Sequence, residues 1–299
     1  MRLPAHYSKS VASVQPSVAD RPPLWLWPTI LSLDAPAVVL LWQALLASAA
    51  SVSAGPAEVF VLGSSVWLAY SADRWIEGWR LLPESIRTHR HRFHQRRRWP
   101  LAAAWATVLC LDLAAALRGL SAREFRAGLV LLIPVSAYLL SHQFVHRHNR
   151  WRAPKEICVA VLLGAGAALF VASRPGADLH ALSVPLALFV FLCFSNCALI
   201  SLWEDSVDRS HGQTSLAVQF GRAAEFNRAV PWAICAVCVA LLLMGGKGTR
   251  PAAACGAVSA ALLGLIDLSE ARIGRVLARV LADVALMTPA FPILARLLA

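Results

Sequence analysis

Two pairs of acidic residues lie four positions apart, each at the end of a long apolar run. One pair is Asp73 and Glu77, in WLAYSADRWIEGWR, and the other is Glu204 and Asp208, in SLWEDSVDRSHG. Four residues advance an α-helix by little more than one turn, so each pair would direct both carboxylates to the same side. Carboxylates at membrane depth are costly and usually functional. The two pairs therefore predict a catalytic site that holds Mg²⁺, which binds carboxylate and phosphate oxygens.

Basic residues cluster near both acidic pairs and would suit an anionic ligand. Arg74 and Arg209 each follow an aspartate, Lys155 begins a further apolar run, and Arg87 and Arg90 lie in the basic segment RLLPESIRTHRHRFHQRRRWP. Beside a metal–phosphate centre, such side chains neutralise charge that develops on a diphosphate leaving group. In an alternative interpretation, they are the positive-inside signal of a membrane protein and attract anionic lipid.

The acidic pairs also have a purely structural interpretation, in which they end their helices at the membrane surface and pair with nearby arginines. An arginine directly follows both Asp73 and Asp208, which suits that interpretation. The recurrence of the pattern four apolar runs apart, on the same face of the membrane, favours a shared site instead.

Four more polar residues lie within apolar runs: Asp34, Asp112, Asn196 and Asp283. Asn196 precedes Glu204 by about two helical turns. It is predicted to reach the same cavity as the acidic pairs or, alternatively, to form an interhelical hydrogen bond. No partner for Asp34 or Asp283 is visible in the sequence, and the role of all three aspartates is left open.

The composition places these residues in a membrane protein. Of 299 residues, 58% are hydrophobic and 15% are charged, and the mean hydropathy is +0.59. Soluble domains carry about 25% charged residues. The net charge of +11 could indicate a nucleic-acid partner. Because the basic residues lie in short links between apolar runs, membrane orientation is the better explanation, and no nucleic-acid partner is expected.

Nine apolar runs are long enough to cross a bilayer, which takes about 20 residues each. They predict an all-α, polytopic bundle of about nine transmembrane helices. Residues 1–24 are expected to be a disordered leader, and residues 25–299 a single transmembrane helical domain. The nine predicted spans are 25–50, 56–78, 99–118, 125–146, 155–173, 180–203, 228–245, 251–268 and 276–298.

The distribution of Lys and Arg among the links sets the expected orientation. The leader and the links on its side carry 20 of these residues, and the links on the other side together with the C-terminal end carry 7. By the positive-inside rule the N-terminus is then cytoplasmic. Nine spans place the C-terminus outside, in agreement with the charge count.

With these features, the sequence resembles the UbiA-type intramembrane prenyltransferase superfamily. The similarity lies in YSADRWIEG with the basic link after it, in KEICVAVLLGAGAALF, and in EDSVDRSHGQTSLAVQFGRAAE. The chain departs from the family pattern at Ala69, where Asn is usual, at Glu77, where Asp is usual, and at Ser206 and Val207, which are often acidic in the family.

The resemblance implies a nine-helix bundle around a central cavity, with two acidic motifs that bind an isoprenyl diphosphate through Mg²⁺. It also implies transfer of the prenyl group to a lipophilic, possibly aromatic, acceptor, in the cytoplasmic membrane of a bacterium. A terpene cyclase of this architecture, a non-catalytic lipid-binding protein with the same fold, and a secondary transporter are the alternatives. Acceptor identity, prenyl chain length, protein partners and oligomeric state are not specified by the sequence.

Overall fold

The structure is a computed structural model, and it describes residues 22–80, 89–141, 154–210, 215–246 and 248–298. Within these ranges the regular elements are all helices, as predicted. Residues 1–21 of the predicted leader lie outside the described residues. The helices are η1 (Leu24–Leu26), α1 (Trp27–Ile30), α2 (Asp34–Ala49), α3 (Pro56–Arg80), α4 (His89–Arg96), α5 (Arg98–Gly119), α6 (Ala122–Leu140), α7 (Lys155–Ser173), α8 (Leu179–Trp203), α9 (Asp205–Ser210), α10 (Leu216–Phe220), η4 (Gly221–Ala229), α11 (Val230–Met244), α12 (Arg250–Ile273), α13 (Arg275–Ala285) and α14 (Ala290–Leu298).

Each of the nine predicted spans overlaps one to three consecutive helices. Among the described residues, five helical segments are long and apolar enough to cross a membrane, and a sixth is added if a bent pair counts as one span. The chain is therefore an integral, multi-pass membrane protein. The count of nine spans and the orientation of the two ends stay predictions.

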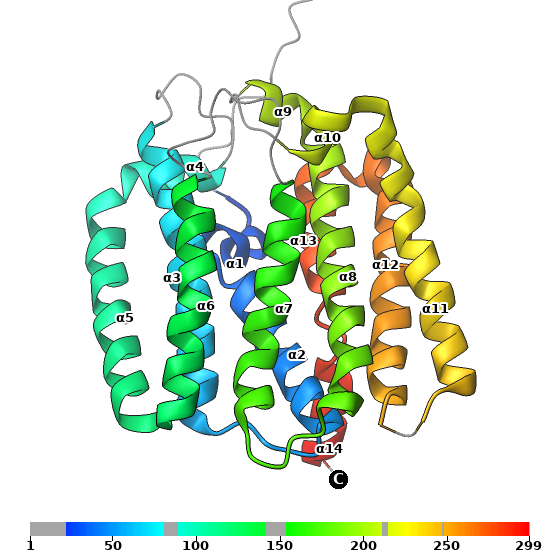
Figure 1. Ribbon diagram of the computed structural model, residues 1–299. Helices are drawn as coiled ribbons and strands as arrows, with labels where there is room; N and C mark the ends of the chain where they lie inside the picture. The colour runs from blue at the N-terminus through cyan, green and yellow to red at the C-terminus, as the bar shows by residue number, and fades with distance from the viewer. Residues whose placement is uncertain (1–21, 81–88, 142–153, 211–214, 247, 299) are drawn as a thin grey trace, which may run out of the picture.

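The outer helices expose apolar side chains, as lipid-facing helices do. α5, at the left edge of Figure 1, exposes Leu109, Leu111, Leu113 and Leu117 by 41–63%. In water a face of this kind would favour association, whereas in a bilayer it contacts lipid chains at no cost.

The first predicted span is broken into two helices. α1 and α2 meet at 77°, and Ser32 between them has a positive φ of 58°. Two carbonyl oxygens at this break accept side-chain hydrogen bonds from α3: Trp67 Nε1 donates to Leu31 O at 2.9 Å and Arg74 Nη1 to Thr29 O at 2.7 Å. Unpaired carbonyl groups at membrane depth are costly, so these bonds stabilise the break. The break places Asp34 at the start of α2, inside the bundle.

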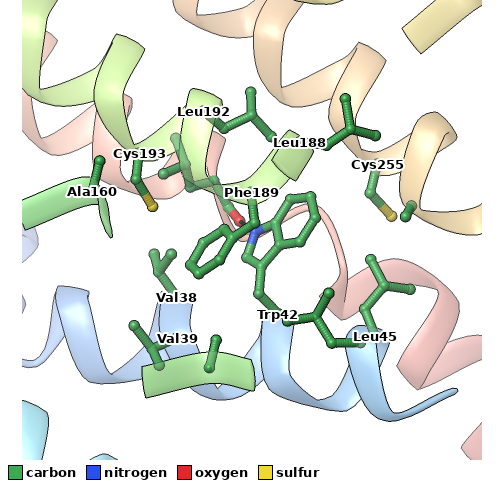
Figure 2. Close-up of a cluster of buried hydrophobic side chains, with 14 of the residues drawn as sticks. Val38, Val39, Trp42, Leu45, Ala160, Leu188, Phe189, Leu192, Cys193 and Cys255 are labelled. Carbon is green, nitrogen blue, oxygen red and sulfur yellow. Dashed lines mark hydrogen bonds between the residues drawn. The ribbon is translucent and has the colours of Figure 1, made fainter. Parts of the chain in front are cut away.

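α2 lies at the centre of the bundle and packs against α3, α7, α8, α12 and α13 (Figure 1). In the core, Trp42 of α2 stacks on Phe189 of α8 with ring centroids 4.9 Å apart (Figure 2). The indole Nε1 of Trp42 donates to Leu286 O at 2.8 Å. Aromatic stacking and this hydrogen bond fix α2 and α8 relative to the last predicted span.

Small residues allow close approach of α7 and α8. Gly164 is buried where these helices meet, and a Cβ on it would clash with Cγ2 of Val190. We expect Gly164→Ala to destabilise the protein by about 1–3 kcal/mol, because the clash separates two packed helices. Gly128→Ala on α6 is the matched control, since a Cβ there meets no atom within 4 Å. Thermal unfolding in detergent micelles should show a lower midpoint only for Gly164→Ala.

The predicted orientation leads to a separate test. A reporter fused after Ala299 should be external, and one inserted between α3 and α5 should be cytoplasmic, because the basic links favour the cytoplasm. Paired alkaline phosphatase and green fluorescent protein fusions read the two sides independently. A cytoplasmic C-terminus would contradict the nine-span topology.

Candidate functional site

The acidic motif at the end of α8 contains an ion pair between Glu204 and Arg279. Arg279 of α13 donates from Nη1 to both carboxylate oxygens of Glu204, at 2.7 and 2.6 Å. Glu204 is the C-cap residue that follows α8, and the backbone N–H of Asp208 donates to Glu204 O at 2.9 Å. This helical turn continues the chain from α8 into α9. The two acidic residues are thus held one turn apart, as their spacing predicts.

Asp208 is buried and faces α7. Its Oδ2 lies 3.6 Å from Nζ of Lys155, the first residue of α7. Glu156, the next residue, is 2% exposed and accepts a hydrogen bond at Oε1 from the backbone N–H of Leu216. Among the described residues, Glu156 Oε2 has no hydrogen-bond partner. Two carboxylates and one ammonium group therefore meet where α7, α9 and α10 come together.

The other acidic motif lies at the same end of the bundle, on α3. Asp73 is partly buried, and both Asp73 and Glu156 interact electrostatically with Tyr138 of α6. Tyr138 is thus near an acidic residue of α3 and an acidic residue of α7. Arg74 is buried beneath this surface and caps α1 through Thr29. Its contact with a diphosphate stays a prediction.

Three of the predicted site residues lie wholly or partly outside the described part of the chain. Arg87 lies outside the described residues, and the side chains of Glu77 and Arg90 do so as well, although their backbones belong to α3 and α4. Arg209 is described, and its Nε contacts both carboxylate oxygens of Asp205 at 3.0 Å on an exposed surface. We refer to the end of the bundle that carries Asp73, Lys155, Glu204 and Asp208, at the top of Figure 1, as the acidic end.

Asn196 lies deeper in the bundle, about 12 Å along α8 from Glu204 at 1.5 Å per residue. Its Nδ2 donates to Asp283 Oδ1 of α13 at 3.0 Å. The carboxyl group of Asp283 also interacts with that of Asp34 at the start of α2. The predicted interhelical hydrogen bond of Asn196 is therefore present. We refer to Asp34, Asn196 and Asp283 as the inner cluster.

A further group of polar contacts surrounds the C-terminal turn of α8. Asp267 of α12 accepts hydrogen bonds from Trp203 Nε1, at 2.9 Å, and from Arg228. Arg275 donates to Ser206 Oγ at 2.8 Å and to Trp203 O. These contacts fix the last turn of α8, directly before Glu204.

Glu156 and Arg279 are the residues of the site that sequence reasoning missed. Glu156 is adjacent to a predicted site residue and is a carboxylate at the start of an apolar helix, which is a usable signal. Arg279 was counted only as a basic residue of the last link. Arg279 precedes Asp283 by four residues, so the two lie on the same face of the helix. This position could have indicated that Arg279 points into the bundle.

The donor set of the acidic end suits a hard cation in part. Asp208 and Glu156 offer carboxylate oxygens beside Lys155, and the unpartnered Oε2 of Glu156 is the kind of atom that a hard cation would satisfy. Glu204, in contrast, is already bound by a guanidinium group. Within the described residues, no group of three or more potential ligands has the spacing of a metal site. Asp208 and Glu156 are thus better candidates to hold Mg²⁺ than Glu204, and the participation of Asp73 stays a prediction.

Comparison with known proteins identifies the fold. The sequence matches no protein-family model and no curated protein. Among solved structures, the chain is similar to the apo structure of a UbiA homolog from Aeropyrum pernix K1, with a TM-score of 0.58 and 17% sequence identity. The match covers 89% of this chain and 98% of the other. The predicted resemblance is confirmed at the level of architecture: this chain has the fold of a UbiA homologue.

Proposed function

We propose that the protein is an integral-membrane prenyltransferase, which moves an isoprenyl group from its diphosphate to a lipophilic acceptor with the help of Mg²⁺. The observation that carries this proposal is the buried Asp208 beside Lys155 and Glu156, at one end of a UbiA-like bundle. Buried carboxylates next to a lysine suit a metal-bound diphosphate better than they suit a neutral lipid. We place the reaction at the cytoplasmic face of a bacterial inner membrane.

In the proposed reaction the bond between the allylic carbon and the diphosphate oxygen breaks, and the diphosphate leaves with the electron pair. The acceptor forms a new bond to the resulting allylic cation and releases a proton, which the diphosphate or solvent takes up. Asp73 and Asp208 would hold Mg²⁺, which would supply charge neutralisation on the diphosphate when bound. Lys155 neutralises charge on the departing group, because its ammonium lies at the start of α7 beside Asp208. Arg87, Arg90 and Arg209 are proposed to add to the positive potential that attracts the anion.

Calorimetric titration with geranylgeranyl diphosphate tests the proposal. The purified protein should bind this probe in the presence of Mg²⁺ and bind it much more weakly in the presence of EDTA. A coupled assay for released diphosphate, with a quinol or phenol acceptor added, then separates an enzyme from a binder. Metal-independent binding with no release of diphosphate would contradict the prenyltransferase proposal.

One observation favours the lipid-binding alternative and defines a second candidate function. Glu204, expected to bind metal, is bound by Arg279. The family's second acidic motif is thus partly occupied by an internal cation. A non-catalytic protein of this fold that binds isoprenoid lipids would bind geranylgeraniol and its diphosphate with similar affinity. The titration above distinguishes the two candidates when geranylgeraniol is included.

A further inference from the structure

The inner cluster contains buried polar atoms that the protein itself does not satisfy. Asp34 and Asn196 are 6% and 7% exposed. One oxygen of Asp34 accepts from the backbone N–H of Ala35 at 3.0 Å. Within the described residues, Asp34 Oδ2 and Asn196 Oδ1 have no hydrogen-bond donor. Such groups in a native interior call for a partner, either bound water or a ligand.

Both unsatisfied atoms are hydrogen-bond acceptors, and this limits what can bind them. Asn196 uses its amide nitrogen on Asp283, and its carbonyl oxygen is left for another donor. Even when the carboxyl groups of Asp34 and Asp283 share a proton, Asn196 Oδ1 still lacks a donor. A bound group must therefore donate a hydrogen bond to be held here.

The charges around the inner cluster restrict the ligand further. Two adjacent buried carboxyl groups would meet a further carboxylate with like groups that cannot neutralise it, so a carboxylate ligand is disfavoured. Arg279 interacts electrostatically with both Asp34 and Asp283, and a second cation beside its guanidinium would be repelled. An uncharged donor satisfies both constraints.

The position of the cluster relates it to the acidic end. Arg279 and Asp283 lie four residues apart on α13, so they lie on one face of the helix about 6 Å apart along its axis. Arg279 points to Glu204 of the acidic end. A molecule bound at the inner cluster would therefore lie about one helical turn further into the bundle than a diphosphate bound at the acidic end.

We propose that Asp34, Asn196 and Asp283 form a binding site for an uncharged hydroxyl group, of the phenol type, on an otherwise apolar molecule. Naming this molecule as the prenyl acceptor rests on the proposed function, whereas the binding site itself does not. The site would accept a phenol or hydroquinone and would reject a benzoate or an alkylammonium of the same size.

Two matched probes test this site without any diphosphate or Mg²⁺. Tritiated 4-octylphenol and its methyl ether, 4-octylanisole, differ in whether the oxygen can donate a hydrogen bond. With the protein in lipid nanodiscs, scintillation proximity should show binding of the phenol about tenfold or more tighter than the ether, as expected for a hydrogen bond to a buried carboxylate. The anion 4-octylbenzoate should compete more weakly than the phenol.

Substitutions within and outside the cluster provide the controls. Asp34→Leu and Asn196→Leu should each remove the preference for the phenol, and Asp34→Asn should reduce it if Asp34→Leu fails to fold. Asp112→Leu is the matched control, because Asp112 is another intramembrane carboxyl group, which accepts from Ser64 Oγ at 2.5 Å. It should keep the full preference.

Equal affinities of the wild-type protein for phenol and ether would overturn the proposal and would mean that the cluster holds only water. A preference that persists in both leucine variants of the cluster would overturn it as well. Because the assay contains no diphosphate, its outcome is independent of the proposed transferase reaction. Binding of geranylgeranyl diphosphate without a phenol preference would refute this inference alone.

Discussion

Asp208→Ala is expected to abolish Mg²⁺-dependent binding of geranylgeranyl diphosphate, and Asp73→Ala is expected to do the same. The two residues project from α9 and α3, so each substitution removes a carboxylate from a different side of the acidic end. Asp208→Asn and Asp73→Asn should weaken diphosphate binding nearly as much, because the amide keeps the shape of the side chain and loses the charge that attracts Mg²⁺. Calorimetric titration of each variant measures the effect directly.

Asp112→Ala serves as the matched control for loss of an intramembrane carboxylate. Asp112 lies on α5, where it accepts hydrogen bonds from Ser64 and Ser65 of α3. This variant should bind the diphosphate as the wild-type protein does. If Asp208 only paired with Lys155 to hold two helices together, Asp208→Ala would lower stability and leave the affinity for diphosphate unchanged. That result would contradict a metal-binding role.

Much of the fold could be predicted because apolar length is a strong signal in a bilayer. The helices α5, α7 and α8 begin and end within one residue of the predicted spans, and α12 begins one residue before its predicted span and ends five residues after it. The break between α1 and α2 was not foreseen, since it depends on Ser32 and on side chains of α3 that bind carbonyl groups at the break. A one-dimensional pattern does not contain such contacts.

The candidate site was predictable as a set of carboxylates but not as a set of partners. The spacing of Glu204 and Asp208 indicated two acidic groups one turn apart, and in the structure the two residues do lie one helical turn apart. It did not indicate that Glu204 would contact Arg279, 75 residues away. Asp34, Asn196 and Asp283 come from three distant helices, and only the packing of α2, α8 and α13 brings them together.

The partner of Glu204 gives the second large expected effect. Arg279→Met should destabilise the protein by about 3–5 kcal/mol, because it leaves the carboxylate of Glu204 without its guanidinium in a largely buried position. It also removes the positive charge beside Asp283. The midpoint of thermal unfolding in detergent micelles should fall accordingly.

A double substitution separates the lost ion pair from the lost packing. Glu204→Gln combined with Arg279→Met removes both charges, so it should recover a large part of the stability lost in Arg279→Met alone. Arg209→Met is the matched control, because Arg209 forms an ion pair with Asp205 that is largely solvent-exposed, and such pairs contribute only about 0–1 kcal/mol. If Arg279→Met were no less stable than Arg209→Met, Glu204 would not depend on its internal cation. Its carboxylate would then be available to bind Mg²⁺, as the sequence alone predicts.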